Sequence, residues 1–127
     1  MIDQALAERL RILNEGGVID EDARKGVERG IELLASKYGI ALNGALGERF
    51  TTHVAMAIMR VRRGEAAAAP QGEVYDDFRE MPEFRKAEDV GKELEDAFGV
   101  EFPASERQYV VMNLCTLFEE SGTGKEH

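Results

Sequence analysis

His53 is the residue of this 127-residue chain whose type and surroundings offer chemistry. On a helix that turns 100° per residue, it lies at the edge of a sector of apolar side chains. Arg49 precedes it by four residues and Arg60 follows it by seven, so both share its stripe within about 40°. The spacing therefore predicts a locally basic strip, with Arg63 nearby, around one histidine.

This strip suggests two interpretations. A neutral imidazole with a pKa near 6.5 is a competent nucleophile close to neutral pH. Phosphorylated on a ring nitrogen, it would carry about two negative charges, and the guanidinium groups of Arg49 and Arg60 could bind them in a fork. The spacing also fits a histidine at the boundary of the core, packed by its ring and satisfied by one hydrogen bond. The residues alone leave both interpretations open.

Asn113 interrupts an apolar run from Tyr109 to Cys115. A buried amide without hydrogen-bond partners costs about 1–3 kcal/mol. We therefore expect either a structural hydrogen bond from Asn113 to the end of a neighbouring helix or an amide that faces a cleft. Cys115 in the same helix is expected to be a small buried hydrophobic residue.

The composition excludes several classes of site. A formal net charge of −9 argues against a nucleic-acid binder, which needs clustered Lys and Arg. One cysteine and two histidines exclude a disulfide framework, a Cys-rich zinc site and a His-rich metal site, so no metal is expected. We find no glycine-rich phosphate loop and no distinguishable pair of catalytic carboxylates. The prediction is a protein without a cofactor that is not an enzyme.

The same composition predicts where the chain resides. No stretch approaches about 20 uninterrupted apolar residues, so no membrane span is expected. Charged residues interrupt the amphipathic N-terminus, which does not resemble a secretory signal. A cytoplasmic location follows as the expectation.

Apolar stripes at helical spacing predict an all-α bundle of five helices, over roughly residues 2–15, 20–38, 48–63, 82–98 and 105–118. Asp20 is expected to cap the second helix, Pro82 to open the fourth, and Ser105 with Gln108 to form a capping box on the fifth. Residues 65–72 are expected to form an exposed, mobile loop, which extends towards Met81 with a short turn at residues 75–78. One domain spans residues 1–120, and a flexible tail spans residues 121–127.

Two further patterns concern packing and charge. Gly26 and Gly30 lie inside the second helix, where each costs roughly 1 kcal/mol relative to Ala, so a neighbouring helix is expected to approach there. Residues 45–65 carry four Arg and two Glu, whereas residues 73–101 carry 11 acids and four bases. The chain is thus predicted to have an acidic helix surface and a small basic strip at His53.

The chain resembles the PTS regulation domain, or PRD, of regulators controlled by the bacterial sugar phosphotransferase system. Three segments in order carry the resemblance: LAERLRILNEGGVI (6–19), FTTHVAMAIMRVRRGE (50–65) and FGVEFPASERQYVVMNL (98–114). Together they extend it over roughly residues 5–118.

The resemblance implies a five-helix PRD-type bundle, often dimeric, that is phosphorylated on histidine by HPr or a sugar-specific component of the phosphotransferase system. His53 matches the first family histidine. The second would fall at Asn113, and Thr52 stands where many members have aspartate. We therefore expect a stand-alone regulatory module that pairs with itself or with another PRD-containing regulator and modulates transcription regulation. The alternative is a degenerate, unphosphorylated PRD that acts in dimerisation or binding.

Overall fold

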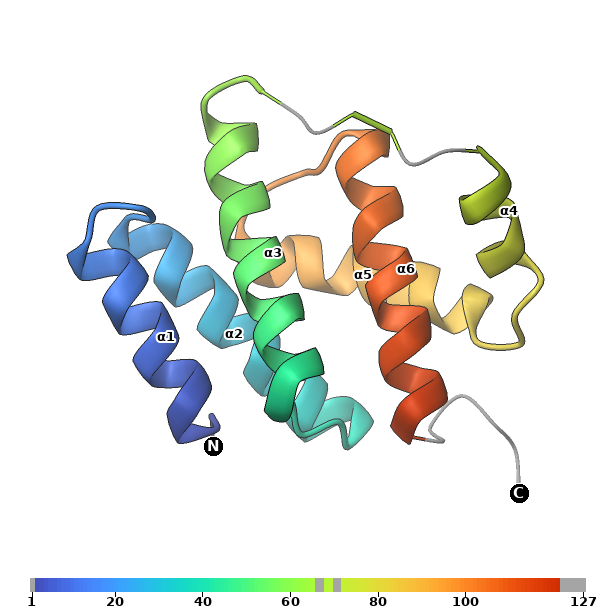
Figure 1. Ribbon diagram of the computed structural model, residues 1–127, viewed down its shortest axis with the longest axis horizontal. Coiled ribbons are helices and arrows are strands. Elements are labelled where there is room, and N and C mark those ends of the chain that lie inside the picture. The colour runs from blue at the N-terminus through green and yellow to red at the C-terminus, as the bar shows by residue number, and fades with distance from the viewer. Residues whose placement is uncertain (1, 66–67, 70–71, 122–127) are drawn as a thin grey trace.

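The structure is a computed structural model that describes residues 2–65, 68–69 and 72–121. Within these ranges the chain forms helices and no strand. The helices are α1 (Gln4–Glu15), α2 (Glu21–Tyr38), α3 (Gly44–Arg62), α4 (Gly72–Arg79), α5 (Phe84–Phe98) and α6 (Ala104–Ser121). In Figure 1, α1, α2 and α3 lie together at one end of the molecule, and α4 lies at the other end beyond α6.

Local sequence signals set the ends of the first two helices. The Asp20 carboxylate accepts a hydrogen bond from the Ala23 amide at 2.8 Å, which confirms it as the cap of α2. Gly39 ends the same helix with φ at 68°, a left-handed conformation that suits glycine. Asp3 caps α1 in the same way as Asp20 caps α2.

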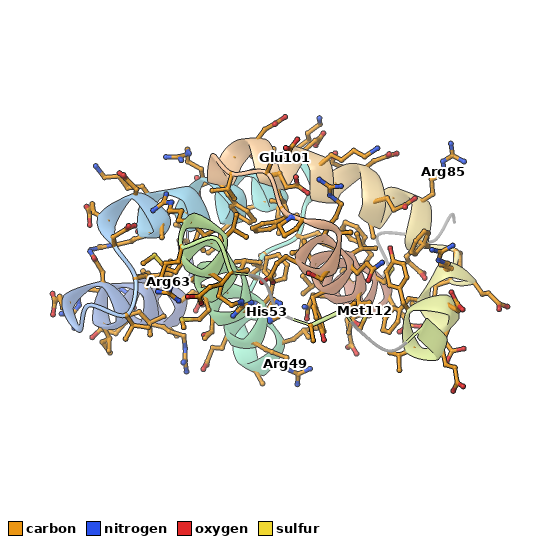
Figure 2. The ribbon with its side chains drawn as sticks, turned by 90° about the horizontal axis from the view of Figure 1, so that it is seen from above. Arg49, His53, Arg63, Arg85, Glu101 and Met112 are labelled. Atoms are coloured by element: carbon orange, nitrogen blue, oxygen red, sulfur yellow. The ribbon has the colours of Figure 1, made fainter. Side chains whose placement is uncertain are left out.

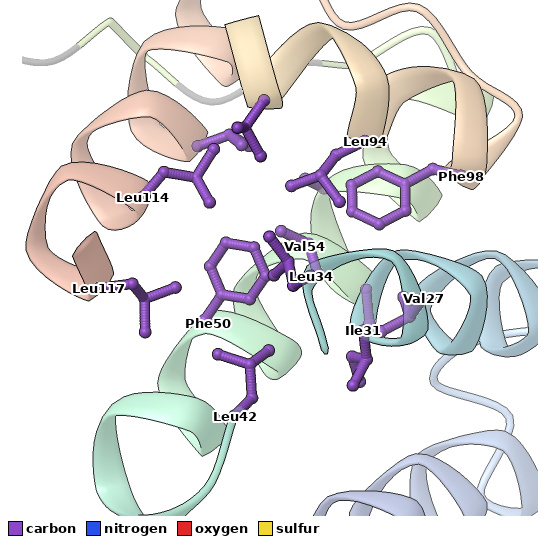
Figure 3. Close-up of a cluster of buried hydrophobic side chains, with 14 of the residues drawn as sticks. Val27, Ile31, Leu34, Leu42, Phe50, Val54, Leu94, Phe98, Leu114 and Leu117 are labelled. Atoms are coloured by element: carbon purple, nitrogen blue, oxygen red, sulfur yellow. The ribbon is translucent and has the colours of Figure 1, made fainter. Parts of the chain in front are cut away.

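The core lies where α2, α3, α5 and α6 meet, and its aliphatic and phenyl side chains come from all four helices (Figure 3). Gly26 and Gly30 allow the close approach of α2 to α5 that the sequence predicted. A Cβ atom at Gly26 would lie 2.8 Å from the backbone oxygen of Phe98, and one at Gly30 would overlap the Phe98 ring. These glycines let α5 pack directly on the backbone of α2.

The all-α class is confirmed, but the prediction of five helices is wrong: the described residues form six. The additional helix is α4, which the sequence reading reduced to a short turn. It has only two turns, and Tyr75 is its one buried residue, so no apolar stripe of useful length marks it.

Three predicted boundaries also differ. α3 begins at Gly44 rather than near Glu48. Pro82 precedes α5, whose first helical residue is Phe84, instead of occupying its first turn. Ser105 lies inside α6, which starts at Ala104, so it is not the cap of that helix. Boundaries depend on tertiary contacts as well as on local signals, so single residues shift in this way.

Two predicted features fall partly outside the described residues. They are the mobile loop predicted at residues 65–72, of which residues 66–67 and 70–71 lie outside, and the flexible tail predicted at residues 121–127, of which residues 122–127 lie outside. Of the helices that the structure describes, none has the length and apolar character needed to cross a membrane.

Candidate functional site

His53 lies on α3 where this helix faces α6, half-buried between the two (Figure 2). Its ring packs against the ring of Tyr109 with 5.6 Å between centroids and 52° between planes. The Nε2 atom is enclosed and has no hydrogen-bond partner within the described residues. His53 is therefore a boundary residue held by ring packing, without the hydrogen bond that the structural interpretation expected.

Beside His53, an ion pair joins α3 to α6. Arg60 donates from Nε and Nη2 to the two carboxylate oxygens of Glu106, at 2.8 and 2.9 Å. The Glu106 side chain is completely buried, and that of Arg60 is about one quarter exposed, at 25%. The Arg60 guanidinium, which the sequence predicted as a ligand of the phosphoryl group, is thus already bound by both oxygens of a carboxylate. That carboxylate belongs to a residue 46 positions later in the chain.

These surroundings lower the pKa of His53 below its usual value of 6.5. Burial of the ring is the main cause, since it disfavours the charged form, and the positive charge of Arg60 acts in the same direction. Glu106 opposes them. The ring is consequently neutral at neutral pH, with a lone pair on one nitrogen, which is the form that attacks an electrophile.

The lowered pKa predicts a specific pH dependence of stability. Below about pH 6.5 the unfolded chain takes up the His53 proton more readily than the folded chain, so stability decreases as the pH falls. We expect the urea midpoint to fall more steeply between about pH 7 and about pH 5 in the parent protein than in His53→Gln. His127→Gln serves as the matched control and should retain the steep fall. Equal slopes in the parent and His53→Gln would contradict the assignment.

Of the other arginines near His53, two form ion pairs and one has no partner among the described residues. Arg62 binds the Asp20 carboxylate at 2.7 and 2.9 Å, and Arg63 lies 3.7 Å from Glu65. Arg49 is exposed and has no ion pair or hydrogen bond with any described residue. It extends from α3 one turn before His53, as Figure 2 shows. Most of the basic strip is thus neutralised internally, and Arg49 is its available cation.

Asn113 is linked to His53 through Tyr109. Its Nδ2 donates to the backbone oxygen of Tyr109 at 2.9 Å, within the same helix. The expected hydrogen bond to a neighbouring helix end is therefore absent from the described residues, and the amide is satisfied one turn back along α6. Cys115 is buried, as expected.

The threonines before His53 do not orient its ring. Thr51 is fully buried, Thr52 is half-buried, and the hydroxyl oxygens of both have no hydrogen-bond partner among the described residues. No group of the described part of the chain therefore fixes the imidazole through a hydrogen bond. Packing against Tyr109 holds the ring, and burial, followed by the charge of Arg60, keeps it neutral.

Sequence reasoning missed Glu106 and Tyr109 as parts of this site. Glu106 stands four and eight residues before the buried Val110 and Leu114, in phase with the apolar stripe of α6. An acidic residue at a core position requires a cation or a proton. The position of Glu106 within the apolar stripe was the available signal, and the arginines of the basic strip on α3 were the candidate partners of its carboxylate.

Comparison with known proteins agrees with the resemblance. A family model described as PRD domain matches residues 28–115, which include His53, Arg60 and Asn113 and leave out the first of the three segments. A relative from Escherichia coli (strain K12), named "Uncharacterized protein YhfY", is 29% identical over 110 residues, or 87% of this chain and 92% of the relative. No solved structure matches. The family match extends over more than half of the sequence, from α2 to α6, and on that ground the chain belongs to the PRD domain family.

Proposed function

We propose that the chain is a regulatory module whose switch is the phosphorylation of His53 by HPr or a sugar-specific component of the sugar phosphotransferase system. The observation that supports this most is a neutral imidazole between an unpaired arginine, Arg49, and a buried ion pair, Arg60–Glu106. Membership in the PRD domain family is consistent with regulation rather than catalysis.

The transfer step uses groups that the site supplies. The lone pair of a His53 ring nitrogen attacks the phosphorus of a phosphohistidine on the carrier. The new N–P bond forms as the carrier's N–P bond breaks. The proton on the other ring nitrogen of His53 is lost as the carrier's imidazole takes one up, so that this imidazole leaves as the neutral base. Because Nε2 is enclosed, Nδ1 would be the attacking nitrogen. Arg49, which is exposed on α3 one turn before His53, would bind the incoming phosphoryl oxygens.

The switch itself is a competition for Arg60. A phosphoryl group on His53 brings about two negative charges next to the Glu106 carboxylate, which already holds both donors of one guanidinium edge. The phosphate repels Glu106 and attracts Arg60. Because Glu106 belongs to the first turn of α6, the modification changes the packing of α3 on α6. An altered surface then changes association with a second copy or with another PRD-containing regulator, and through it transcription regulation.

The direct test is phosphoryl transfer with purified components. The protein is incubated with labelled phosphoenolpyruvate, the kinase of the phosphotransferase system and HPr, and acid-labile label on the chain is counted. We expect label on the parent protein and on His127→Ala, which removes the other histidine, and none on His53→Ala. Label that persists in His53→Ala, or an unlabelled parent with every carrier tested, would refute the proposal.

Arg49→Met should weaken the acceptor function without unfolding the protein. Arg49 is exposed and makes no hydrogen bond or ion pair with the described residues, whereas a charge-assisted hydrogen bond to the phosphoryl group contributes about 1.5–3 kcal/mol. We expect the initial rate of labelling to fall roughly tenfold or more. Arg63→Met removes another exposed arginine, at the opposite end of the same helix, and should change the rate less than about twofold. Equal effects of the two substitutions would exclude a specific role for Arg49.

A second candidate function is association without phosphorylation. It is favoured by Thr52, whose hydroxyl does not hydrogen-bond to the imidazole, and by Asn113, which cannot accept a phosphoryl group at the second family position. The chain would then dimerise or pair with another PRD-containing regulator in its unmodified state. Association of unmodified protein that is unaffected by His53→Ala, together with absence of label, would favour this function over the first.

A further inference from the structure

Glu83 is a buried carboxylate that is not hydrogen-bonded to any described residue. Its side chain is 1% exposed, and neither carboxylate oxygen has a partner within the described residues. It occupies the cap position before α5, yet its side chain accepts no hydrogen bond from the start of that helix. A carboxyl group removed from water without hydrogen bonds is destabilising in either protonation state. The carboxyl group of Glu83 would therefore be more stable if it were exposed to water.

Glu83 ends a short segment that places one buried side chain and two half-buried ones, Phe78 and Met81, against the core. The segment consists of α4 and the turn that follows it, residues 72–83, which we term the arm. α4 has eight residues, too few for a helix that is stable without tertiary contacts. Its one buried residue, Tyr75, packs edge-on against Phe84 at 5.7 Å between centroids. Arg79 covers the Tyr75 ring at 5.2 Å.

The arm packs on one side of the core. α4 packs against α5 and α6, and in Figure 1 it lies at the end of the molecule, away from α1 and α2. α5 is held independently, by the backbone of α2 at Gly26 and by the Arg107–Glu95 pair at 2.7 and 3.0 Å. Loss of the arm's contacts would leave these interactions in place.

We propose that the arm opens from α5 and α6 while the remaining helices stay folded, and that the buried carboxylate of Glu83 sets how often it opens. Opening returns Glu83 to water and uncovers apolar surface on α6, around the buried Cys115. Local opening of this kind is drawn from the least stable part of a fold. This device does not depend on phosphorylation of His53.

Cys115, the one cysteine of the chain, reports the opening. It is fully buried, and its pKa is raised to about 12, first by burial and then by the negative charge of Glu83, so the closed form is unreactive. Tyr75 on the arm lies close enough to Cys115 that ionisation of the thiol would raise the pKa of the Tyr75 hydroxyl. A thiol reagent such as DTNB, added in excess to the folded full chain, should therefore label Cys115 only when the arm has moved.

The test compares labelling rates in three proteins: the parent, Glu83→Met and Glu80→Met. Methionine fills the space of Glu83 without a buried charge, so we expect labelling at least tenfold slower than in the parent. Glu80 lies on the same arm and is exposed, so Glu80→Met should label within about twofold of the parent rate. In the parent, the rate should depend only weakly on low urea concentrations, because opening exposes little surface.

The electrostatic effect of Glu83 on the Cys115 thiol, taken alone, predicts the opposite change in the labelling rate. Removal of the Glu83 charge lowers the pKa of the thiol in the closed form, which would accelerate labelling. Slower labelling of Glu83→Met therefore supports the opening arm, and Glu83→Gln should shift the rate in the same direction if Glu83→Met does not fold. An unchanged or faster rate in both variants would overturn the proposal. So would a parent rate that follows global unfolding across all urea concentrations.

Discussion

Arg60→Met should destabilise the protein by about 3–5 kcal/mol, the range found when one partner of a buried ion pair is removed. The substitution keeps the length of the apolar stem but removes both hydrogen bonds to the fully buried Glu106 carboxylate. Equilibrium urea unfolding at neutral pH measures the change, as a lower midpoint with an unchanged slope. A loss of this size would place the pair among the main determinants of the α3–α6 contact.

Two variants establish that burial causes this loss. Arg62→Met, two residues away, removes the ion pair of Arg62 with Asp20, whose side chains are 30% and 52% exposed, and should cost at most about 1 kcal/mol. The double variant Arg60→Met with Glu106→Met should recover most of the stability, because well-packed apolar groups replace a buried pair at little cost. A loss for Arg60→Met no larger than that for Arg62→Met would contradict the structure.

Gly26→Ala should destabilise by about 1–3 kcal/mol, the usual cost of overpacking a core. Alanine favours a helix by roughly 1 kcal/mol over glycine, but its Cβ atom at position 26 would lie 2.8 Å from the backbone oxygen of Phe98. Backbone atoms cannot move aside as the end of a side chain can. α2 and α5 must separate, and urea unfolding should report the loss.

Gly91→Ala provides the matched control, since Gly91 is also a buried glycine inside a helix. A Cβ atom there would meet Val111 and Leu114 at 3.7 and 3.8 Å, ordinary contact distances. The gain in helix propensity then dominates, and we expect a stabilisation of up to about 1 kcal/mol. The two substitutions are chemically identical, so opposite signs would demonstrate that the approach of α5 to α2 sets the requirement for glycine. A stabilising Gly26→Ala would show that this contact is looser than described.

The fold was predictable wherever local signals coincide with an apolar stripe. The sequence predicts the cap at Asp20 and the end of α2 at Gly39, because both depend on residues that are close in the chain. It also predicts the close approach at Gly26, because a glycine inside a helix is unfavourable unless another helix packs against it. α4 was not predictable as a helix. Two turns with one buried residue carry no periodicity, and the contacts of Tyr75 with α5 decide its conformation.

The position of the candidate site could be predicted from the sequence, but the pairing of its charged residues could not. The helical period predicted that Arg60 lies on the same stripe of α3 as His53. In the structure the positive charge of Arg60 lowers the pKa of the imidazole. The period could not reveal that Glu106 binds Arg60, because the two residues belong to helices far apart in the sequence. Their pairing depends on how α6 packs on α3, and so does the contact of Tyr109 with the imidazole. Among the described residues, the arginine of the strip without an ion pair is Arg49 and not Arg60.

The average molar mass of the protein by light scattering, before and after phosphoryl transfer, tests the proposed switch at His53 most directly. If a phosphoryl group on His53 shifts the equilibrium between copies of the chain, the mass of the parent protein changes on phosphorylation and returns when the label is removed. His53→Ala, treated identically, should keep one mass throughout. A parent protein that carries label but shows the same mass before and after transfer would contradict the account, as would an equal shift in His53→Ala.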